Sequence, residues 1–551
     1  NLKPPSLLPT PATAPKRKND SSVRSSSLFP PNSSTRFKLQ RILRTVRRLI
    51  HLTVLSVPIA MLSPIAKRSS KFKNQTFLPL CLRQAERGGA VVIKLCQWAS
   101  SRPDIFGVEF CDLFKSLQDG TTPHGWDHTE RLIKSAYAKQ YKEGKLKIQV
   151  GEGGNEVLGS GCMAQVYKGT IVEDDGSEKA VAVKVMHPNV RDGIEHDLNI
   201  FRFLAHSLER VPYFGIGEKV KWNNLCGTVD EFARMLEPQL NLCNEARHIQ
   251  TFNDNFESSP NVMFPTLIPG YDAHPDVLVE NFCEGVPLQQ FCKDHKGEDT
   301  LLAEMCDLMA HVMCTMIFEH NFVHGDLHPG NIFVATTDEE TSDSSLKTKY
   351  KLVLLDCGIV NEYNEDDHDV IIKIIAAFIR MDGRRAAELM AADSDRRLLS
   401  SSDGTSSVKN AEEYISQIEM LSKTPRKSDF FFEKVTTYIN YIFNAASEHH
   451  VKMNPSFVSM ALAVKVQEGV ALMLNPQGDI IKIANPIIMK AEADRIKEGG
   501  VGKLKLLVED LWRDWRVKVE REQRAAFGKN AGAYDSDNAY AADIGLKAQR
   551  A

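Results

Sequence analysis

The sequence feature that most constrains the fold is the stretch FVHGDLHPGNIFV, at residues 322–334. Apolar residues bracket a polar segment with a Pro-Gly pair, a pattern that predicts two short strands joined by an ordered loop. Asp326 and Asn331 lie five residues apart on this loop. A second apolar run, YKLVLLD at 350–356, ends in Asp356. The sequence therefore places three oxygen-bearing side chains on a loop and at a strand end, where they can hold a ligand.

A glycine-rich turn lies between two strand-like runs in EVLGSGCMAQVYKGTIV. Glycines let the backbone approach a phosphate closely, and successive N–H groups can bind an anion. Taken alone, such a turn also fits an ordinary hairpin. Lys184 follows inside the apolar run AVAVKVM, where a lysine is unusual unless it is paired or lies at an edge. The candidate phosphate-binding residues of the turn are Gly159, Ser160, Gly161, Cys162, Met163 and Ala164.

These elements occur in the order found in protein kinases: a glycine loop, Val-Ala-x-Lys, His-x-Asp with a following Asn, and a strand-end Asp. In that chemistry Lys184 binds the α- and β-phosphates and Asp326 faces the substrate hydroxyl. Asn331 and Asp356 supply hard oxygen ligands for Mg²⁺, so ATP and Mg²⁺ are the expected cofactors. His328 stands where kinases usually have a lysine, and no Ala-Pro-Glu follows the Asp-Cys-Gly segment. A platform for a peptide substrate is therefore not expected.

The motif HGDLHPGN resembles the signature of the UbiB family of AarF-domain (ABC1) atypical kinases. The segment KLCQWASSRPDIFG at 94–107 resembles the Lys-x-Gly-Gln helix that precedes the kinase core in that family, and 456–476 resembles its late helix. The GSGC turn is similar to that of the AarF-domain-containing kinase two branch. The resemblance covers residues 86–490. It implies an α+β, atypical protein-kinase-like, two-lobed fold, with a small β-sheet N-lobe, a helical C-lobe and a helical N-terminal extension.

The resemblance also implies roles for residues outside the opening loop. Glu245, in NEARH, corresponds to the helix partner of Lys184. Lys94 and Gln97 correspond to the family's inserted Lys and Gln, whose helix lies over the site where a peptide would otherwise bind. In the late helix, core packing is the expected role of the Met and Leu residues, with a lipid groove as the alternative. Two further candidate nucleotide-binding residues end the strand-like run DVLVENF: Glu280 and Phe282.

Three positions depart from the family pattern. Cys96 replaces the glycine of the Lys-x-Gly-Gln motif. Gln239 and Asn241 stand where the family usually has Glu-x-Asp, the acidic pair that holds the inserted lysine. Charge-assisted hydrogen bonds are roughly twice as strong as neutral ones, so we expect the helix of Lys94 to be held less firmly than in typical relatives. The alternative is that this branch uses other contacts at the same place.

The charge distribution separates a basic leader from an acidic body. Residues 1–85 carry 16 Lys and Arg and a single acid, Asp20, whereas the remainder carries 52 basic and 70 acidic residues. The body lacks a basic field that would collect phosphates, so no nucleic-acid partner is expected. The eleven cysteines are scattered without a CxxC pair, which favours a reducing compartment over a disulfide scaffold.

Within this basic stretch, residues 1–48 are expected to be the leader proper. The segment RFKLQRILRTVRRLI, at residues 36–50, contains apolar residues at helical spacing interleaved with arginines. This pattern is typical of a mitochondrial targeting segment, with a disordered basic tail as the alternative. Residues 49–66 carry no formal charge but include two prolines and barely reach the length of a membrane span. Both a transmembrane helix and an interfacial or buried helix fit. The expected location is mitochondrial, at the inner membrane.

The remaining chain is expected to form a helical extension at 86–150, a kinase-like N-lobe at 151–285, a kinase-like C-lobe at 286–495, and a C-terminal helix and disordered tail at 496–551. The resemblance implies an ATPase or a small-molecule or lipid kinase that supports coenzyme Q or lipid metabolism at the mitochondrial membrane. The implied partners are a membrane lipid or quinone-type small molecule and coenzyme Q biosynthetic proteins. A nucleotide-sensing pseudokinase scaffold for membrane enzymes is the alternative. A true protein kinase is favoured by the glycine-rich loop and opposed by the missing Ala-Pro-Glu.

Overall fold

The computed structural model describes residues 35–100, 123–151, 154–155, 157–210, 225–336, 350–380, 382–400, 410–423, 435–449, 451, 453–475 and 486–490. Three predicted segments lie outside this set: the first 34 residues of the leader, the part of the second family motif beyond residue 100, and residues 496–551.

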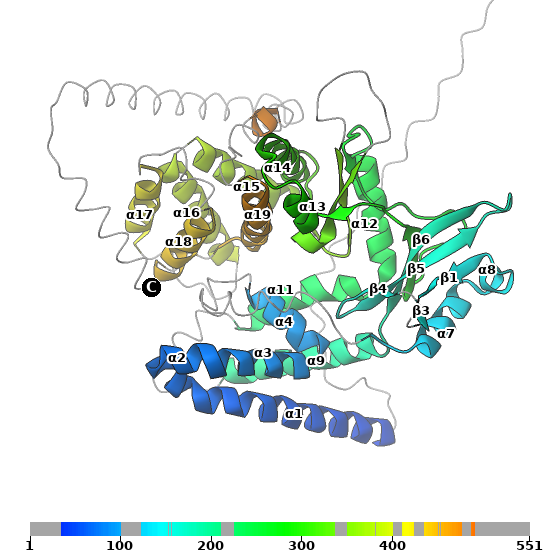
Figure 1. Ribbon diagram of the computed structural model, residues 1–551. Coiled ribbons are helices and arrows are strands. Elements are labelled where there is room, and N and C mark those ends of the chain that lie inside the picture. Colours follow the sequence, from blue (N-terminus) through cyan, green and yellow to red (C-terminus); the bar gives the residue numbers. More distant parts are fainter. Residues whose placement is uncertain are drawn as a thin grey trace, which may run out of the picture.

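The N-terminal region is a layer of helices at one end of the molecule (Figure 1). Its helices are α1 (Thr35–Arg68), α2 (Ser70–Phe72), η1 (Lys73–Phe77), α3 (Leu78–Arg87) and α4 (Ala90–Ser100). α1 runs without interruption across the boundary expected between residues 48 and 49, although Pro58 and Pro64 lie inside it. Each proline removes one backbone hydrogen bond. The helix nevertheless continues to Arg68, ten residues beyond Pro58 and four beyond Pro64.

The small lobe is an antiparallel sheet in the order β1-β5-β6-β8, with β4 also paired to β5. Its strands are β1 (Leu146–Ile148), β4 (Val157–Ser160), β5 (Ala164–Val172), β6 (Glu178–Met186) and β8 (Val277–Asn281). The hairpin between β5 and β6 turns at Asp174, Asp175 and Gly176, and Gly176 has a φ of 83°, which suits a glycine. β1 pairs with β5, so the sheet begins before the lobe boundary expected at residue 151. A separate pair of short strands joins β2 (Val150–Gly151) and β3 (Gly154–Asn155).

Helices cover the small lobe and connect it to the large one (Figure 1). They are α7 (Trp126–Ala136), α8 (Ala138–Lys142), α9 (Val190–Arg210), α11 (Leu225–Leu236), η3 (Glu237–Leu240) and α12 (Leu242–Asn255). Ile133 of α7 is fully buried against the strands, in a cluster with Tyr167 and Val183. α12 begins at Asn241, whose side chain caps it, and Phe252 on the same helix packs into the core of the large lobe.

The large lobe is mostly helical around two small sheets. Its helices are α13 (Leu288–Asp294), α14 (Asp299–Cys314), η4 (Thr315–Glu319), η5 (Pro329–Asn331), α15 (Glu365–Ile379), α16 (Gly383–Ser400), α17 (Ala411–Lys423), α18 (Val435–Glu448) and α19 (Pro455–Leu474). Its strands are β7 (Val262–Met263), β9 (Val286–Pro287), β10 (Phe322–His324), β11 (Ile332–Thr336), β12 (Tyr350–Leu354) and β13 (Val360–Glu362). β7-β12-β11-β9 form one sheet and β10-β13 the other. The predicted α+β, two-lobed fold is confirmed.

The two strands predicted around the opening motif are β10 and β11, and the predicted strand before Asp356 is β12. β11 pairs antiparallel with β12, which aligns Ile332 with Leu354. The polar loop and the strand end are therefore neighbours at one edge of the sheet. In α19, Met460 and Leu474 are buried in the main core, as expected for packing residues, whereas Met473 is exposed.

Candidate functional site

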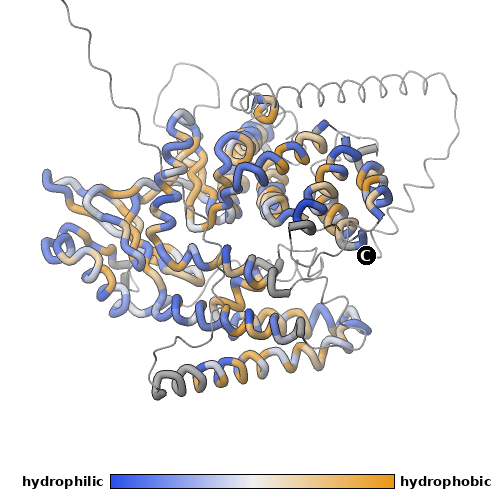
Figure 2. Tube along the Cα trace, turned by 180° about the vertical axis from the view of Figure 1, so that it is seen from behind, coloured by the Kyte–Doolittle hydropathy of each residue, from blue (hydrophilic) through white to orange (hydrophobic). Residues whose placement is uncertain are grey.

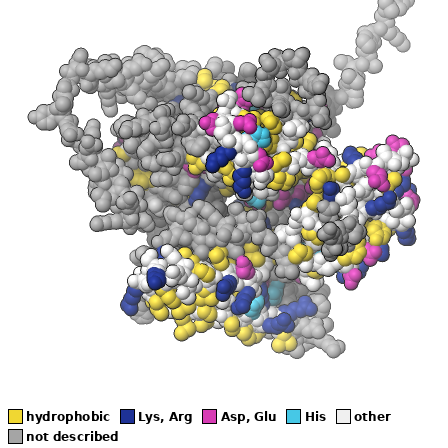
Figure 3. All heavy atoms as spheres, in the orientation of Figure 1, with side chains coloured by type: hydrophobic (Ala, Val, Ile, Leu, Met, Phe, Trp, Pro, Cys, Tyr) yellow, Lys and Arg dark blue, Asp and Glu magenta, His cyan; other side chains and the backbone are white. Residues whose placement is uncertain are grey.

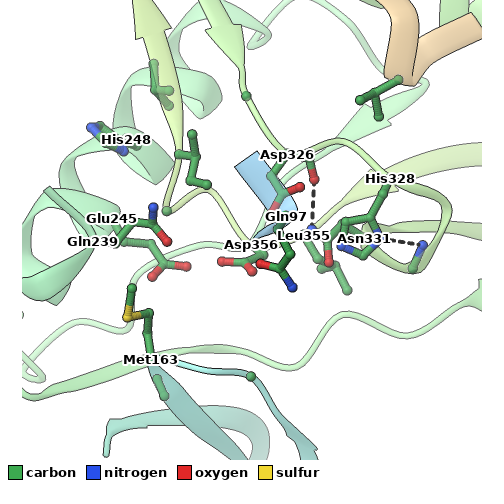
Figure 4. Close-up of a pocket in the computed structure, with 18 of the residues that line it drawn as sticks. Gln97, Met163, Gln239, Glu245, His248, Asp326, His328, Asn331, Leu355 and Asp356 are labelled. Atoms are coloured by element: carbon green, nitrogen blue, oxygen red, sulfur yellow. Dashed lines mark hydrogen bonds between the residues drawn. The ribbon is translucent and has the colours of Figure 1, made fainter. Parts of the chain in front are cut away.

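Every site residue predicted from the sequence lines a single cavity, about 1710 Å³ in volume, to which both lobes contribute. The small lobe supplies the β4–β5 turn, β6 and the end of β8, where Glu280 and Phe282 lie. The large lobe supplies the loop after β10 and the end of β12. Figure 4 shows Asp326, Asn331 and Asp356 facing the same space as Glu245. The fold thus gathers residues that are more than 200 positions apart, from α4 to the end of β12.

Lys184 on β6 connects acidic groups from two different elements. Its Nζ lies 2.7 Å from Oε1 of Glu245 on α12 and 2.7 Å from Oδ1 of Asp356 after β12. Burial alone lowers the pKa of Lys184, but the carboxylates of Asp356 and Glu245 raise it above the ordinary value overall. The side chain is 14% exposed, so water screens its charge only weakly. Lys184 therefore provides a permanent positive charge inside the cavity.

The two carboxylates that bind Lys184 differ in their ionisation. The ammonium of Lys184 lowers the pKa of Asp356 below its usual range, although burial opposes this. Burial raises the pKa of Glu245 to about 7, with Lys184 acting in the opposite direction. Asp356 also has a φ of 57°, a left-handed conformation that is uncommon for a residue with a side chain. Asp356 is therefore an anion at the end of β12, and the surrounding structure holds its backbone in this uncommon conformation.

His324 fixes the opening loop against the end of β12. Its Nδ1 accepts a hydrogen bond of 3.2 Å from the backbone N–H of Asp326. Its Nε2 lies 3.0 Å from the carbonyl oxygen of Leu355, and because a carbonyl only accepts, Nε2 carries the proton. Burial lowers the pKa of His324, so the ring stays neutral at neutral pH. The buried histidine therefore sets the position of Asp326 relative to Asp356.

Asn331 and His328 also bond within the loop. Nδ2 of Asn331 donates to the backbone oxygen of Asp326 at 2.9 Å, which orients the carboxamide. Nδ1 of His328 accepts from the backbone N–H of Gly330 at 3.1 Å and closes the short η5 turn. His328, which replaces the kinase lysine, thus has a structural contact in the loop.

The oxygen atoms of the cavity fit Mg²⁺. Mg²⁺ binds hard oxygens and usually keeps several waters or phosphate oxygens, so one carboxylate and one carboxamide are sufficient protein ligands. Asp356 is ionised, and the amide nitrogen of Asn331 is already committed to a hydrogen bond, which leaves its Oδ1 to accept. Across the described ranges, no group of three or more His, Cys, Asp or Glu has a metal-binding arrangement. In that part of the chain, a magnesium site would rely on phosphate or water ligands.

Lys94 reaches the cavity from the N-terminal extension, on α4. Burial alone lowers its pKa, but Cys162 and the carboxylates of Asp326 and Asp356 raise it overall. Gln97, from the same helix, lines the cavity as well (Figure 4). The N-terminal extension therefore brings a second positive charge near the loop aspartate.

The two amides that replace the family's acidic pair form local bonds. Nε2 of Gln239 donates to the backbone oxygen of Met235 at 3.0 Å. Oδ1 of Asn241 accepts from the backbone N–H of Cys243 at 3.0 Å, as the N-cap of α12. Within the described part of the chain, neither amide hydrogen-bonds to Lys94. That the helix of Lys94 is held less firmly than in relatives stays a prediction.

Sequence reasoning missed a chain of hydrogen bonds that ends at the glycine-rich turn. The contacts run from Gln165 to Tyr167 (2.8 Å), Thr129 (2.8 Å), His124 (2.8 Å), His187 (2.6 Å) and the carbonyl oxygen of Gly161 (2.8 Å). His124 precedes α7, so the N-terminal extension holds the turn directly. Isolated histidines carry no pattern that predicts such contacts, although His187 comes directly after the apolar run that contains Lys184.

Comparison with known proteins agrees with this geometry. Residues 116–390 match the family model of the ABC1 atypical kinase-like domain. A mitochondrial ABC1 family protein of Schizosaccharomyces pombe is 29% identical over 502 residues, covering 80% of this chain and 69% of the relative. The chain belongs to the ABC1 atypical kinase-like family.

Two further relatives have a similar sequence identity to this chain over a similar share of its length. A mitochondrial ABC1 family protein of Saccharomyces cerevisiae is 27% identical over 507 residues, covering 81% of this chain and 74% of the relative. The probable protein kinase UbiB of Histophilus somni is 28% identical over 422 residues, covering 76% of this chain and 72% of the relative. The predicted family is confirmed, and the assignment of this ABC1 chain to one branch stays a prediction.

Proposed function

We propose that this ABC1 protein binds Mg²⁺-ATP in the cavity between its lobes and transfers or hydrolyses the terminal phosphoryl group. The observation that carries the proposal is the contact of Lys184 with both Glu245 and Asp356, beside the loop of Asp326. Phosphoryl transfer requires mainly positioning and charge neutralisation, and this arrangement supplies a fixed cation, fixed anions and a hydrogen-bonding loop.

Each group has a distinct role in this proposal. Lys184 binds phosphate oxygens, and the backbone N–H groups of the β4–β5 turn approach the same phosphates. Asn331 and Asp356 hold Mg²⁺, which neutralises phosphate charge when it is bound. Asp326 orients the acceptor hydroxyl or a water molecule, in a position that His324 fixes through its hydrogen bond to the Asp326 backbone.

The proposed acceptor is a small molecule or a lipid rather than a protein. Lys94 lies near Asp326, where an acceptor hydroxyl must approach. An extended peptide would have to displace α4, whereas a small headgroup requires less room. Relatives named as mitochondrial support a mitochondrial location, and the name UbiB of another relative supports a role in coenzyme Q or lipid metabolism. We place the protein at the inner membrane.

The outer face of α1 supports attachment to a membrane. The stretch Leu43–Arg68 is long and apolar enough to cross a membrane, and Figure 2 shows hydrophobic positions along this helix. Only 6% of its most apolar window is buried. Hydrophobic side chains lie along this edge of the molecule (Figure 3). Seven of them are 45–71% exposed and are spaced three or four residues apart: Leu43, Val46, Ile50, Val54, Val57, Met61 and Ile65. We place this apolar stripe of α1 against the membrane, close to lipid or quinone substrates.

A second function, nucleotide sensing without turnover, is favoured by one specific observation. Lys94 places a positive charge near both Asp326 and Asp356, the groups on which turnover depends. If the ammonium of Lys94 stayed beside Asp326 and Asp356 after ATP had bound, these carboxylates could not support transfer. ATP binding would then change the shape of the protein without catalysis. Such a protein would act as a scaffold for membrane enzymes.

ATP turnover by the full chain, with and without phospholipid vesicles, tests the proposal. We expect phosphate release to fall at least about a hundredfold in Asp326→Asn and Asp356→Asn, because each removes a charge needed in the transition state. Asp174→Asn, on the exposed β5–β6 hairpin, makes the same chemical change outside the cavity and should retain full turnover. ATP binding measured by calorimetry without any phosphate release would support the scaffold. Absence of ATP binding would reject both functions.

A further inference from the structure

Glu280 lies at the edge of an apolar part of the cavity. It stands directly opposite Ala182 in the pairing of β8 with β6, so both side chains project from the same face of the sheet. Val166, Phe333 and Leu355 line the cavity together with these residues, so both lobes contribute apolar surface. The small side chain of Ala182 leaves room beside the carboxyl group. A flat aromatic ring fits between such surfaces, with its edge toward Glu280.

The carboxyl group of Glu280 lacks a partner in the described part of the chain. Its Oε2 is buried and accepts no hydrogen bond from any described residue. Lys184, the nearby cation, already donates to Glu245 and Asp356. Leaving a buried acceptor unpaired costs free energy, and native structures rarely do so without a reason. Because Glu280 is only partly buried and lines the cavity, rotation of its carboxyl group can turn an unpaired oxygen toward a hydrogen-bond donor on a ligand.

We propose that Glu280 selects the base of the nucleotide by accepting a hydrogen bond from an exocyclic amino group, as in adenine. This inference rests on the proposed function, because it assumes that the cavity binds a nucleoside triphosphate. A 6-oxo purine such as hypoxanthine presents an acceptor at the same position, and two facing acceptors repel. Sites built to hydrogen-bond one substrate group reject an analogue that lacks it far more strongly than apolar pockets do.

The ionisation of Glu280 decides the conditions of the test. Burial raises the pKa of Glu280 to about 8, and Glu245 adds to this effect while Lys184 opposes it. A neutral carboxyl group can also turn its O–H toward an oxo group, which would weaken the discrimination. Binding is therefore measured at pH 9, where the carboxylate prevails and acts only as an acceptor.

The experiment compares binding of Mg²⁺-ATP and Mg²⁺-ITP to the full chain by calorimetry. We expect the wild type to bind ATP at least about tenfold more tightly than ITP. In Glu280→Gln the ratio should fall below about threefold, because the amide can rotate to donate to the oxo group. Glu178→Gln makes the same change at an exposed position of β6 and should keep the wild-type ratio. Purine riboside triphosphate lacks the 6-substituent, so its affinity for the wild type should lie between those of ATP and ITP. This comparison is made on the wild type alone.

The outcomes separate this inference from the proposed function. Tight ATP binding by the wild type with no preference over ITP overturns the role of Glu280 and leaves the proposed function standing. An equal loss of both nucleotides in Glu280→Gln, with the ratio preserved, assigns Glu280 a structural role and also overturns the inference. Absence of ATP binding by the wild type rejects both.

Discussion

At the scale of single residues, His124 shows how protonation can affect the glycine-rich turn. Because the carbonyl of Gly161 only accepts, His187 donates to it through Nε2, and Nδ1 of His187 must accept from Nδ1–H of His124. Nε2 of His124 then accepts from the hydroxyl of Thr129. A proton added to Nε2 of His124 would reverse that bond, so that Nε2–H donates and the hydroxyl of Thr129 accepts. The hydrogen-bond directions given above therefore belong to the neutral form of His124.

Acidification should destabilise the protein through His124. Burial, His187 and His128 lower the pKa of His124 from 6.5 to about 4. Between these values an unfolded chain binds a proton that the folded chain does not, so stability falls as pH decreases through this window. We expect the Tm of the wild type to fall more steeply between pH 6.5 and pH 4.5 than that of His124→Gln, measured by scanning calorimetry. The exposed His311→Gln is the matched control, and a slope in His124→Gln equal to that of the wild type would contradict the prediction.

At the scale of elements, α1 is fixed along the body of the protein. Nε and Nη2 of Arg48 lie 2.8 and 2.6 Å from the two carboxylate oxygens of Asp197 on α9. Nη2 also donates to the carbonyl oxygen of Gly88, at 2.6 Å. The Asp197 side chain is 5% exposed, so removal of its partner would leave a buried charge, at a cost of about 3 kcal/mol. If α1 attaches to a membrane as proposed, a helix held in this way would meet it along its side, which favours the interfacial over the spanning alternative.

The apolar stripe of α1 should determine vesicle binding. We expect the double variant Val54→Asp, Met61→Asp to lose at least about tenfold in affinity for vesicles that contain anionic lipid, because two exposed apolar contacts become charged. Flotation of the full chain with vesicles measures this affinity. Lys179→Glu, on the exposed end of β6, changes the net charge by the same amount and should bind like the wild type. Equal losses in both variants would show that charge alone controls attachment.

At the scale of the whole molecule, sequence patterns predicted the site better than its surroundings. Lys184, Asp326 and Asp356 each lie in a short segment whose residue types follow from the chemistry, and strands of three different sheets carry these segments to one cavity. The hydrogen bonds of His124 and the unpaired carboxyl of Glu280 depend on which elements pack together, and no local pattern encodes that. The length of α1 was also not predicted, because the charged leader and the apolar run differ in composition although both favour helix.

The N-terminal extension and both lobes meet at Lys94, and restoring the acidic pair tests that coupling. Gln239→Glu with Asn241→Asp adds two carboxylates to the cavity that Lys94 lines. An aspartate caps α12 as well as Asn241 does, so the fold should be preserved. Charge-assisted bonds would hold Lys94 more firmly, and we expect ATP affinity and turnover to fall about tenfold.

Direct repulsion between the new carboxylates and the phosphates would also weaken ATP binding, and the Lys94→Met background separates the two causes. If the acids act by holding Lys94, most of the tenfold loss should disappear in that background, because the cation that they bind is gone. If the loss is the same with and without Lys94, repulsion explains it, and the amides do not loosen α4. Gln289→Glu, exposed on α13, adds one of these two negative charges outside the cavity lining and measures the effect of added charge there. Calorimetric ATP affinities of these variants therefore decide whether the amide pair weakens an inhibitory contact.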